Sequence, residues 1–381
     1  MVSRKARRGG RATIALGVAV ACVAAAPASA QNLDVVADGL SNPRGLAFGP
    51  GGKLFVAESG RGGSGPCIQG PEGEESCYGA TGAIAQVNVR SGKVRRVLRG
   101  LPSHAAQGGD APGADSTGPN DVSFRGRTGY FTIGLGADPA VRRDLGRAGK
   151  RFAGLYRITR KGRVQRVADL GAYERANNPD EGQPSAAVDT NPFSVDATGS
   201  GPILVTDAGG NDLLSVSPRG RVRTVAVFPF TMTLAPPFLG LPAGTQIPVQ
   251  PVPTGVVRAR GGAYVGQLTG FPFPVGGASV FHVTAGSAPE QHATGFTNIV
   301  DIARAGGGAL YVLQLTTTGL AGPPSPGKLI RLAADGSQTE LAAGQLEHPT
   351  GLAVARNGDI YVANQGASPD DAQIVRVASP D

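Results

Sequence analysis

The sequence predicts an all-β fold, a six-bladed β-propeller with four-stranded blades, and three observations carry that prediction. First, one unit recurs along the chain: an apolar stretch, a Gly-rich tight turn and a second apolar stretch, as in NPRGLAFGPGGKLFVAE (42–58) and HPTGLAVARNGDIYVAN (348–364). Second, a further hairpin follows each unit. Third, aromatic residues make up only 5% of the chain and Trp is absent, which disfavours WD40 blades and favours NHL-like blades packed through aliphatic and small side chains.

The hairpins alternate in the order that four-stranded blades require. The first hairpins of the six predicted blades lie at 42–58, 118–133, 191–207, 252–267, 297–314 and 348–364. Second hairpins such as 83–98, 154–169, 213–227 and 328–343 follow them. Six hairpins in register disfavour the alternative, a β-sandwich with chance self-similarity.

The sixth unit ends without its fourth strand, and the missing strand is predicted at the other end of the chain. The segment LDVVADGL (33–40) is similar to the fourth strands VRRVLRGL and VQRVADL. Pairing this N-terminal strand into the last blade closes the ring and leaves no open sheet edge.

The N-terminal segment has the pattern of a secretory signal peptide. Basic residues precede an apolar run, and Ala28-Ser29-Ala30 supplies a small-residue cleavage site. We therefore predict a signal peptide over 1–30 and one propeller domain over 31–381. A twin-arginine signal at Arg7-Arg8 and a lipid-anchoring role for Cys22 remain alternatives.

Cleavage at that site lowers the net charge, and with it the expectation of an anionic partner such as nucleic acid. It removes five cations and no anion, so the net charge falls from +8 to +3. A secreted chain with this charge is not expected to bind nucleic acid or to keep a membrane span, and we expect a monomer.

Two cysteines remain after the predicted cleavage site. Cys67 and Cys77 bracket a polar loop, IQGPEGEES. In an oxidising compartment this spacing predicts a disulfide that staples one loop. The alternative, zinc binding, would need two more ligands, and no histidine lies close by in the sequence.

The long insertions are predicted to gather on one face of the propeller. In a blade, the connections between the second and third strands open on the same face as the connections between blades. All the long segments fall in those two classes, and loops on a rigid scaffold commonly carry function. They are 59–81, 134–152, 268–277, 315–326 and 365–372 within blades, and 103–117, 171–190 and 230–250 between blades.

Polar residues at the strand ends on this face suggest a cation site on the propeller axis. Oxygen-bearing side chains that converge on an axial channel suit Ca²⁺ or another divalent cation, because Ca²⁺ takes six to eight oxygen ligands. The alternative is that these side chains cap strand ends and bind water. The candidate metal ligands are Glu58, Asn120, Asp207, Asn298 and Asn364.

A second set of residues on this face is predicted to contact a ligand. A basic run, RRDLGRAGKR (142–151), is expected to attract anions there. The candidate ligand-contacting residues are Arg44, Asp121, Asn211, Gln267, Phe271, Phe273, Asp301, Gln314 and His348.

Several strings together resemble the ScyD/ScyE family of secreted β-propeller proteins. They include NPRGLAFGP (42–50), CYGATGAI (77–84), TDAGGNDLL (206–214) and GQLTGFPFPVG (266–276), and the resemblance spans about residues 33–378. It implies an extracytoplasmic propeller and carries no catalytic residue set.

Two functions therefore stay open at the level of the sequence. One is a module that binds a small molecule or a protein through the loop-bearing face. The other is a metal-dependent hydrolase, similar to calcium-dependent lactonases, with its metal on the axis. The sequence does not decide whether the protein is an enzyme.

Overall fold

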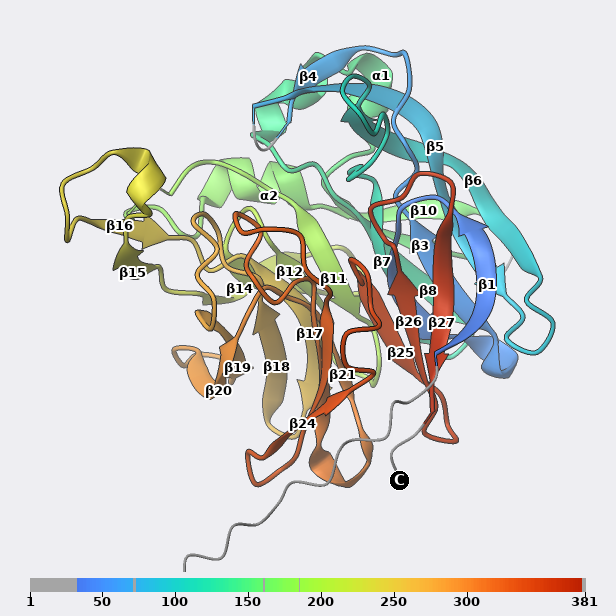
Figure 1. The fold of residues 1–381 in the computed structure, drawn as a ribbon. Helices are drawn as coiled ribbons and strands as arrows, with labels where there is room; N and C mark the ends of the chain where they lie inside the picture. Colours follow the sequence, from blue (N-terminus) through green and yellow to red (C-terminus); the bar gives the residue numbers. More distant parts are fainter. Residues whose placement is uncertain (1–32, 71–72, 160–161, 185, 379–381) are drawn as a thin grey trace, which may run out of the picture. The chain divides into compact units, whose positions relative to one another are not determined.

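The computed structural model describes residues 33–378, except 71–72, 160–161 and 185. The predicted signal peptide and Cys22 lie outside these residues. The described chain forms six antiparallel four-stranded blades, which confirms the predicted six-bladed β-propeller (Figure 1). None of the described helices is long and apolar enough to cross a membrane.

The first three blades follow one another along the chain, each with its first strand innermost. The first blade contains β2 (Pro43–Phe48), β3 (Leu54–Glu58), β5 (Glu75–Val87) and β6 (Val94–Ala106), with the short β4 (Cys67–Gln69) added to β5. The second contains β7 (Pro119–Arg125), β8 (Thr128–Ile133), β9 (Gly154–Ile158) and β10 (Val164–Asp169). The third contains β11 (Pro192–Asp196), β12 (Ile203–Asp207), β13 (Asp212–Val216) and β14 (Val222–Val227).

The last three blades complete the ring. The fourth contains β17 (Pro253–Ala259), β18 (Gly262–Gln267), β19 (Ala278–Val283) and β20 (Glu290–Phe296). The fifth contains β21 (Ile299–Arg304), β22 (Leu310–Gln314), β23 (Lys328–Leu332) and β24 (Gln338–Leu341). The sixth contains β25 (Gly351–Val354), β26 (Ile360–Asn364), β27 (Ala372–Val377) and the N-terminal β1 (Asp34–Leu40).

The N-terminal strand closes the last blade, as the sequence predicts. β1 pairs antiparallel with β27, so the sixth blade combines both ends of the described chain. The innermost strands contact one another in the order β2, β7, β11, β17, β21 and β25, and β25 contacts β2 again. The ring is therefore closed.

Buried apolar side chains fill the spaces between the blades. Six clusters occupy the six blade interfaces; one of them joins Leu40 and Ile374 of the last blade to Leu54 and Val56 of the first. Aliphatic side chains dominate, and aromatic pairs such as Phe55 with Phe124 are occasional. This is the sheet-on-sheet packing that the low aromatic content predicts.

The long insertions, which the sequence predicts as loops, form secondary structure of their own. β5 and β6 extend well into segments predicted as loops, and β4 lies wholly within one. The others contain η2 (Pro139–Arg143), α1 (Gly146–Gly149), α2 (Leu170–Asn177) and the hairpin of β15 (Thr231–Leu234) and β16 (Gln246–Val249). Figure 1 shows β4 and α1 at the top of the ring, α2 below them and β16 at the upper left, all away from the turns that join first to second strands. We call this side the loop face.

Candidate functional site

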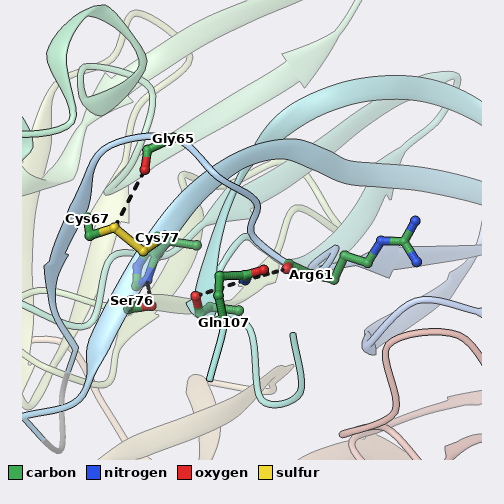
Figure 2. The surroundings of a disulfide bond; sticks show 8 residues. Arg61, Gly65, Cys67, Ser76, Cys77 and Gln107 are labelled. Carbon is green, nitrogen blue, oxygen red and sulfur yellow. Dashed lines mark hydrogen bonds between the residues drawn. A yellow bond between two sulfur atoms is a disulfide. The ribbon is translucent and has the colours of Figure 1, made fainter. Parts of the chain in front are cut away.

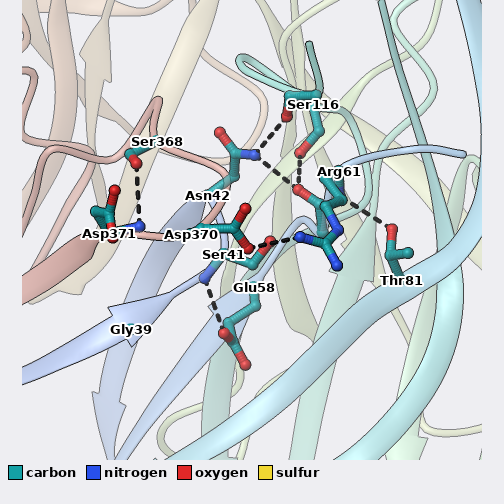
Figure 3. Close-up of polar contacts among 12 residues, drawn as sticks. Gly39, Ser41, Asn42, Glu58, Arg61, Thr81, Ser116, Ser368, Asp370 and Asp371 are labelled. Atoms are coloured by element: carbon teal, nitrogen blue, oxygen red, sulfur yellow. Dashed lines mark hydrogen bonds and ion pairs between the residues drawn. The ribbon is translucent and has the colours of Figure 1, made fainter. Parts of the chain in front are cut away.

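The predicted residues at the ends of the second strands bond to backbone at the entrance of their own blades. Glu58 accepts a hydrogen bond from the backbone amide of Ser41 at 3.0 Å (Figure 3). In the same way, Asn364 Oδ1 accepts from the Glu347 amide at 2.8 Å, and Gln314 Oε1 accepts from the Thr297 amide. These contacts fix the last residue of one strand to the chain that enters the first strand.

Glu58 also has a cationic partner. Arg96 on β6 donates to Glu58 Oε2 at 2.8 Å and to Oε1 at 2.7 Å, and the glutamate side chain is fully buried. This bidentate ion pair occupies both carboxylate oxygens and supplies the charge compensation that burial requires.

The other predicted axial ligands are also held by neighbouring backbone or side chains. Asn120 Nδ2 donates to the Pro192 carbonyl of the next blade, and Asn298 Nδ2 donates to the Leu268 carbonyl of the preceding one. Asp207 accepts from Thr190 Oγ1 at 2.6 Å. Across the described residues, no hydrogen bond joins any two of the five predicted ligands, so the axial cation site stays a prediction.

The central channel holds two of the predicted ligand-face residues, Asp121 and Asp301. A cavity of about 280 Å³ is lined by all six innermost strands, and both aspartates line it. They lie on β7 and β21, three blades apart, and therefore face each other across the axis. Their location is inside the channel and not at the loops.

Every oxygen of this pair has a hydrogen-bond donor. Asp121 accepts from the Val122 and Val195 amides and from Ser194 Oγ, at 2.7 to 2.8 Å. Asp301 accepts from the amides of Ile302 and Leu352, each at 2.8 Å. Burial raises the pKa of Asp121 to about 7, and burial together with the charge of Asp121 raises the pKa of Asp301 well above its usual range.

Arg44 lies at the loop-face end of the channel. Its guanidinium donates to the Ser116 carbonyl at 3.1 Å and to the Gly366 carbonyl at 3.4 Å, and burial lowers its pKa. His348 is exposed on the same side, with its backbone in the left-handed region at φ 39°.

The remaining predicted contacts lie on blades 3 and 4. Gln267 Oε1 accepts from the Ser279 amide at 3.1 Å, and Asn211 donates to Asp180 at 2.9 Å. Phe271 is 44% exposed, and its ring packs edge-on against Phe238 and against Phe273, with the ring centroids 6.2 Å apart in each pair. These aromatic rings are therefore a surface feature beside the β15–β16 hairpin.

The predicted disulfide between Cys67 and Cys77 is present. It joins β4 to β5 (Figure 2), and both strands lie in the extension of the first blade above the loop face. Next to it, the buried His104 contacts Ser76 Oγ through Nδ1 at 2.7 Å and the Leu135 carbonyl through Nε2 at 2.8 Å. Burial lowers the pKa of His104, so this ring is a neutral structural link.

A basic cavity of about 570 Å³ lies on the loop face beside the second blade. Its walls come from η2, α1 and α2, the helical parts of two insertions. Two aspartates, Asp138 and Asp169, also line it. The basic residues that line it are Arg142, Arg143, Lys150, Arg166 and Arg175.

These cations differ in whether they have partners. Arg142 and Arg166 both pair with Asp169, at 2.7 and 3.0 Å. Arg143 is exposed and lies 3.6 Å from Asp144. Within the described part of the chain, the side chains of Lys150 and Arg175 make no hydrogen bond or ion pair. The cavity therefore presents uncompensated positive charge to solvent.

Part of this cavity is predictable from the sequence. The basic run 142–151 predicted an anion-attracting loop and includes Arg142, Arg143 and Lys150. Arg166 and Arg175 were missed, because they come from a strand and a helix that only the fold brings to this loop. The signal available in the sequence was the basic run alone.

Comparison with known proteins supports the fold and no more. No family model matches the sequence, and no curated protein matches it. The structure is similar to a protein of unknown function from Bacteroides thetaiotaomicron, with a TM-score of 0.55 and 10% identity over 91% of this chain and 76% of that one. It is also similar to a candidate oxidoreductase (glucose dehydrogenase) of Thermus thermophilus, with a TM-score of 0.54 and 16% identity over 91% and 99% of the two chains.

A third similar structure is the PQQ-bound form of aldose sugar dehydrogenase from Streptomyces coelicolor. The TM-score is 0.51 and the identity 15%, over 91% of this chain and 98% of that one. At such identities the likeness shows a shared β-propeller architecture.

Proposed function

We propose that this protein is a secreted binding module that holds an anionic ligand in the basic cavity of the loop face. The observation that carries the proposal is the cavity of about 570 Å³ with five basic residues in its lining. Three of these cations, Arg143, Lys150 and Arg175, are exposed. Carboxylate, phosphate or sulfate groups are the chemistry that such a lining recognises.

The rigidity of the walls supports this proposal. Asp169 caps α2 by accepting from the Ala172 amide, and it also pairs with Arg142 and Arg166. One carboxylate thus holds α2, η2 and β10 in a fixed relation, so the free cations are presented on a preorganised frame.

Secretion and kinship with the ScyD/ScyE family belong to the same proposal. The N-terminal pattern and the resembling strings support them, and a disulfide is compatible with an extracytoplasmic location. The alternative, an axial metal-dependent hydrolase, has less support, because Arg96 occupies both oxygens of Glu58.

The test compares two variants that lose the same charge. Citrate, inorganic phosphate and neutral glucose serve as probes in calorimetric titrations at low salt. We expect the anions to bind and glucose not to bind, and we expect Arg143→Gln/Lys150→Gln/Arg175→Gln to weaken anion binding by about tenfold or more.

The matched control is Lys53→Gln/Arg219→Gln/Arg260→Gln, which removes three exposed cations from turns on the opposite face. Its affinity should stay within about twofold of the wild type. Equal weakening in both variants would show that only net charge matters, and no anion binding by the wild type would end the proposal.

A further inference from the structure

A group of five carboxylates lies beside the third blade, separate from the axis and from the basic cavity lining. Two come from the turn between β12 and β13, one from α2, and two from the segment that leads from α2 to β11. They are Asp207, Asp212, Glu174, Asp180 and Asp189, and we call them the blade 3 acidic cluster.

Most of these carboxylates have a buried oxygen without a partner. Asp212 is only 1% exposed, and neither of its oxygens has a hydrogen-bond donor. Glu174 and Asp180 are 2% and 1% exposed, and each has one buried oxygen without a donor. Asp189 has one such oxygen as well. Leaving charged oxygens unpaired in this way costs several kcal/mol unless the group takes up a proton or a countercharge is bound.

No basic side chain supplies that countercharge. Among the described residues, none of the five forms an ion pair with Arg, Lys or His. Burial is the largest effect on each, and the charges of the other cluster members add to it for Glu174, Asp189 and Asp212. The pKa of Glu174 is raised to about 8 and that of Asp189 to about 6.

The surrounding backbone brings these acids together. Asp207 accepts from the Asn191 and Gly210 amides, so it is fixed to the chain on both sides. A Cβ added to Gly209 would lie 2.8 Å from Asp189 Oδ1, and one added to Gly210 would lie 2.9 Å from Glu174 Oε2. The two glycines therefore allow the turn to pass directly against the carboxylates.

We propose that the blade 3 acidic cluster binds a hard divalent cation of the Ca²⁺ class, with Asp212, Glu174, Asp180 and Asp189 as ligands. The donors are all carboxylate oxygens, with no imidazole or thiolate among them, and this set suits Ca²⁺ more than zinc. The bound cation would join α2 and the chain before β11 to the β12–β13 turn.

Binding requires a local contraction of the site. Among the described residues, only Cys67, Glu75 and Cys77 place three ligand atoms within 4.8 Å of one another, and those sulfurs form the disulfide. In the cluster, no three carboxylate oxygens from different residues lie within 4.8 Å of one another. A cation would draw their side chains inward through rotamer changes.

The experiment uses the purified protein after dialysis against EDTA, with CaCl₂ as the only added ligand. We expect calorimetric binding with a Kd of about 10⁻⁴ to 10⁻³ M, as in extracellular calcium modules. We also expect the midpoint of thermal unfolding to rise by about 2 °C or more at saturation.

Asp212→Asn should weaken Ca²⁺ binding by at least about tenfold because it removes a carboxylate ligand, and the variant should still fold because neither oxygen of Asp212 accepts a hydrogen bond. Glu174→Gln is the second variant, with the same expectation. The matched control is Asp301→Asn, another protein-surrounded aspartate with a raised pKa, which should bind Ca²⁺ like the wild type.

Two results would overturn the proposal. One is a wild-type protein that shows neither heat nor a thermal shift with CaCl₂ up to about 10 mM, well above the expected Kd. The other is an unchanged Ca²⁺ affinity in both Asp212→Asn and Glu174→Gln. The anion-binding proposal is independent of either result, because its probes and variants are different.

Discussion

Two groups of carboxylates in this propeller have raised pKa values, and they differ in what surrounds their oxygens. Asp121 and Asp301 in the central channel accept five hydrogen bonds between them from backbone amides and one serine. Asp212 in the blade 3 acidic cluster accepts none at either oxygen. A raised pKa alone therefore does not distinguish a structural acid from a ligand-binding one.

The hydrogen bonds that each carboxylate accepts distinguish the two groups. The channel aspartates serve the fold, because each carboxylate ties one innermost strand to the next: β7 to β11, and β21 to β25. The cluster carboxylates have no basic partner, and burial together with the neighbouring acids raises the pKa of Glu174 to about 8 and that of Asp212 well above its usual range. The first arrangement is complete within the chain, and the second leaves carboxylate oxygens that a proton or the proposed cation would neutralise.

The largest expected effect comes from a third buried acid, Glu58, which is neutralised by Arg96. Arg96→Gln should leave the buried Glu58 without its cationic partner, and should lower the free energy of unfolding by about 3–5 kcal/mol. Urea denaturation measures this. Arg95→Gln is the matched control, since Arg95 is exposed and bonds only to Gln86 there. An equal decrease in the free energy of unfolding in the two variants would show that the Glu58–Arg96 ion pair stabilises the fold no more than the exposed Arg95 does.

The next effect separates the channel from the cluster directly. Asp121 accepts three hydrogen bonds. In Asp121→Asn the side-chain NH₂ group would face at least one of those donors, so the free energy of unfolding should fall by about 2–3 kcal/mol. Asp212→Asn in EDTA should leave the free energy of unfolding unchanged or raise it, because neither oxygen of Asp212 accepts a hydrogen bond and the amide cannot ionise. Chemical denaturation of both variants in EDTA measures the difference. If Asp212→Asn lowers the free energy of unfolding as much as Asp121→Asn does, the cluster carboxylates stabilise the fold in the same way as the channel pair.

A glycine beside the channel allows a steric test of how firmly Asp121 is held. A Cβ added to Gly45 would lie 2.0 Å from Asp121 Oδ1, which its hydrogen bonds hold in place. Gly45→Ala should therefore cost about 1–3 kcal/mol through overpacking. Gly108→Ala is the control, because its Cβ would meet nothing within 4 Å. The midpoint of thermal unfolding should fall in Gly45→Ala and not in Gly108→Ala. Comparable midpoints in the two variants would mean that Asp121 can move away from the added methyl group.

The fold could be predicted from the sequence because its signal repeats. Hairpin periodicity indicated the blades, and the similarity of 33–40 to other fourth strands indicated the closure that β1 and β27 make. The extension of β5 and β6 was not predictable in this way. Its sequence, CYGATGAI, is rich in glycine and small residues and has the composition of a loop. The strand forms because β4 and β6 pair with it on either side.

The candidate sites were less accessible to sequence analysis, for a physical reason. Strand-end position predicted Glu58 as a metal ligand, but only the fold shows that Arg96 from β6 reaches it. Asp207 was identified without Glu174, Asp180, Asp189 or Asp212, because α2 and the following segment fold back onto the turn. A signal was present nonetheless: residues 174–212 contain seven acidic side chains and one basic one, in a chain whose net charge is +8.

The smallest effect is the share of the pH dependence of stability that comes from the channel pair. The blade 3 acidic cluster also has raised pKa values, and its share is common to the wild type and Asp121→Asn. The pKa of Asp121 is about 7 in the folded protein, and that of Asp301 is raised well above 3.8, so the folded state keeps protons that the unfolded chain releases. Their contribution to stability is complete below about pH 4 and is lost as the pH rises through about 7. In EDTA, the midpoint of thermal unfolding should therefore fall by several degrees between pH 5 and pH 8. The slope should be smaller in Asp121→Asn, whose site no longer titrates. Asp212→Asn leaves the channel intact and serves as the comparison. If the midpoint of Asp121→Asn changes with pH as steeply as that of the wild type, the channel carboxylates are ionised throughout. The hydrogen bonds they accept would then outweigh the effect of burial.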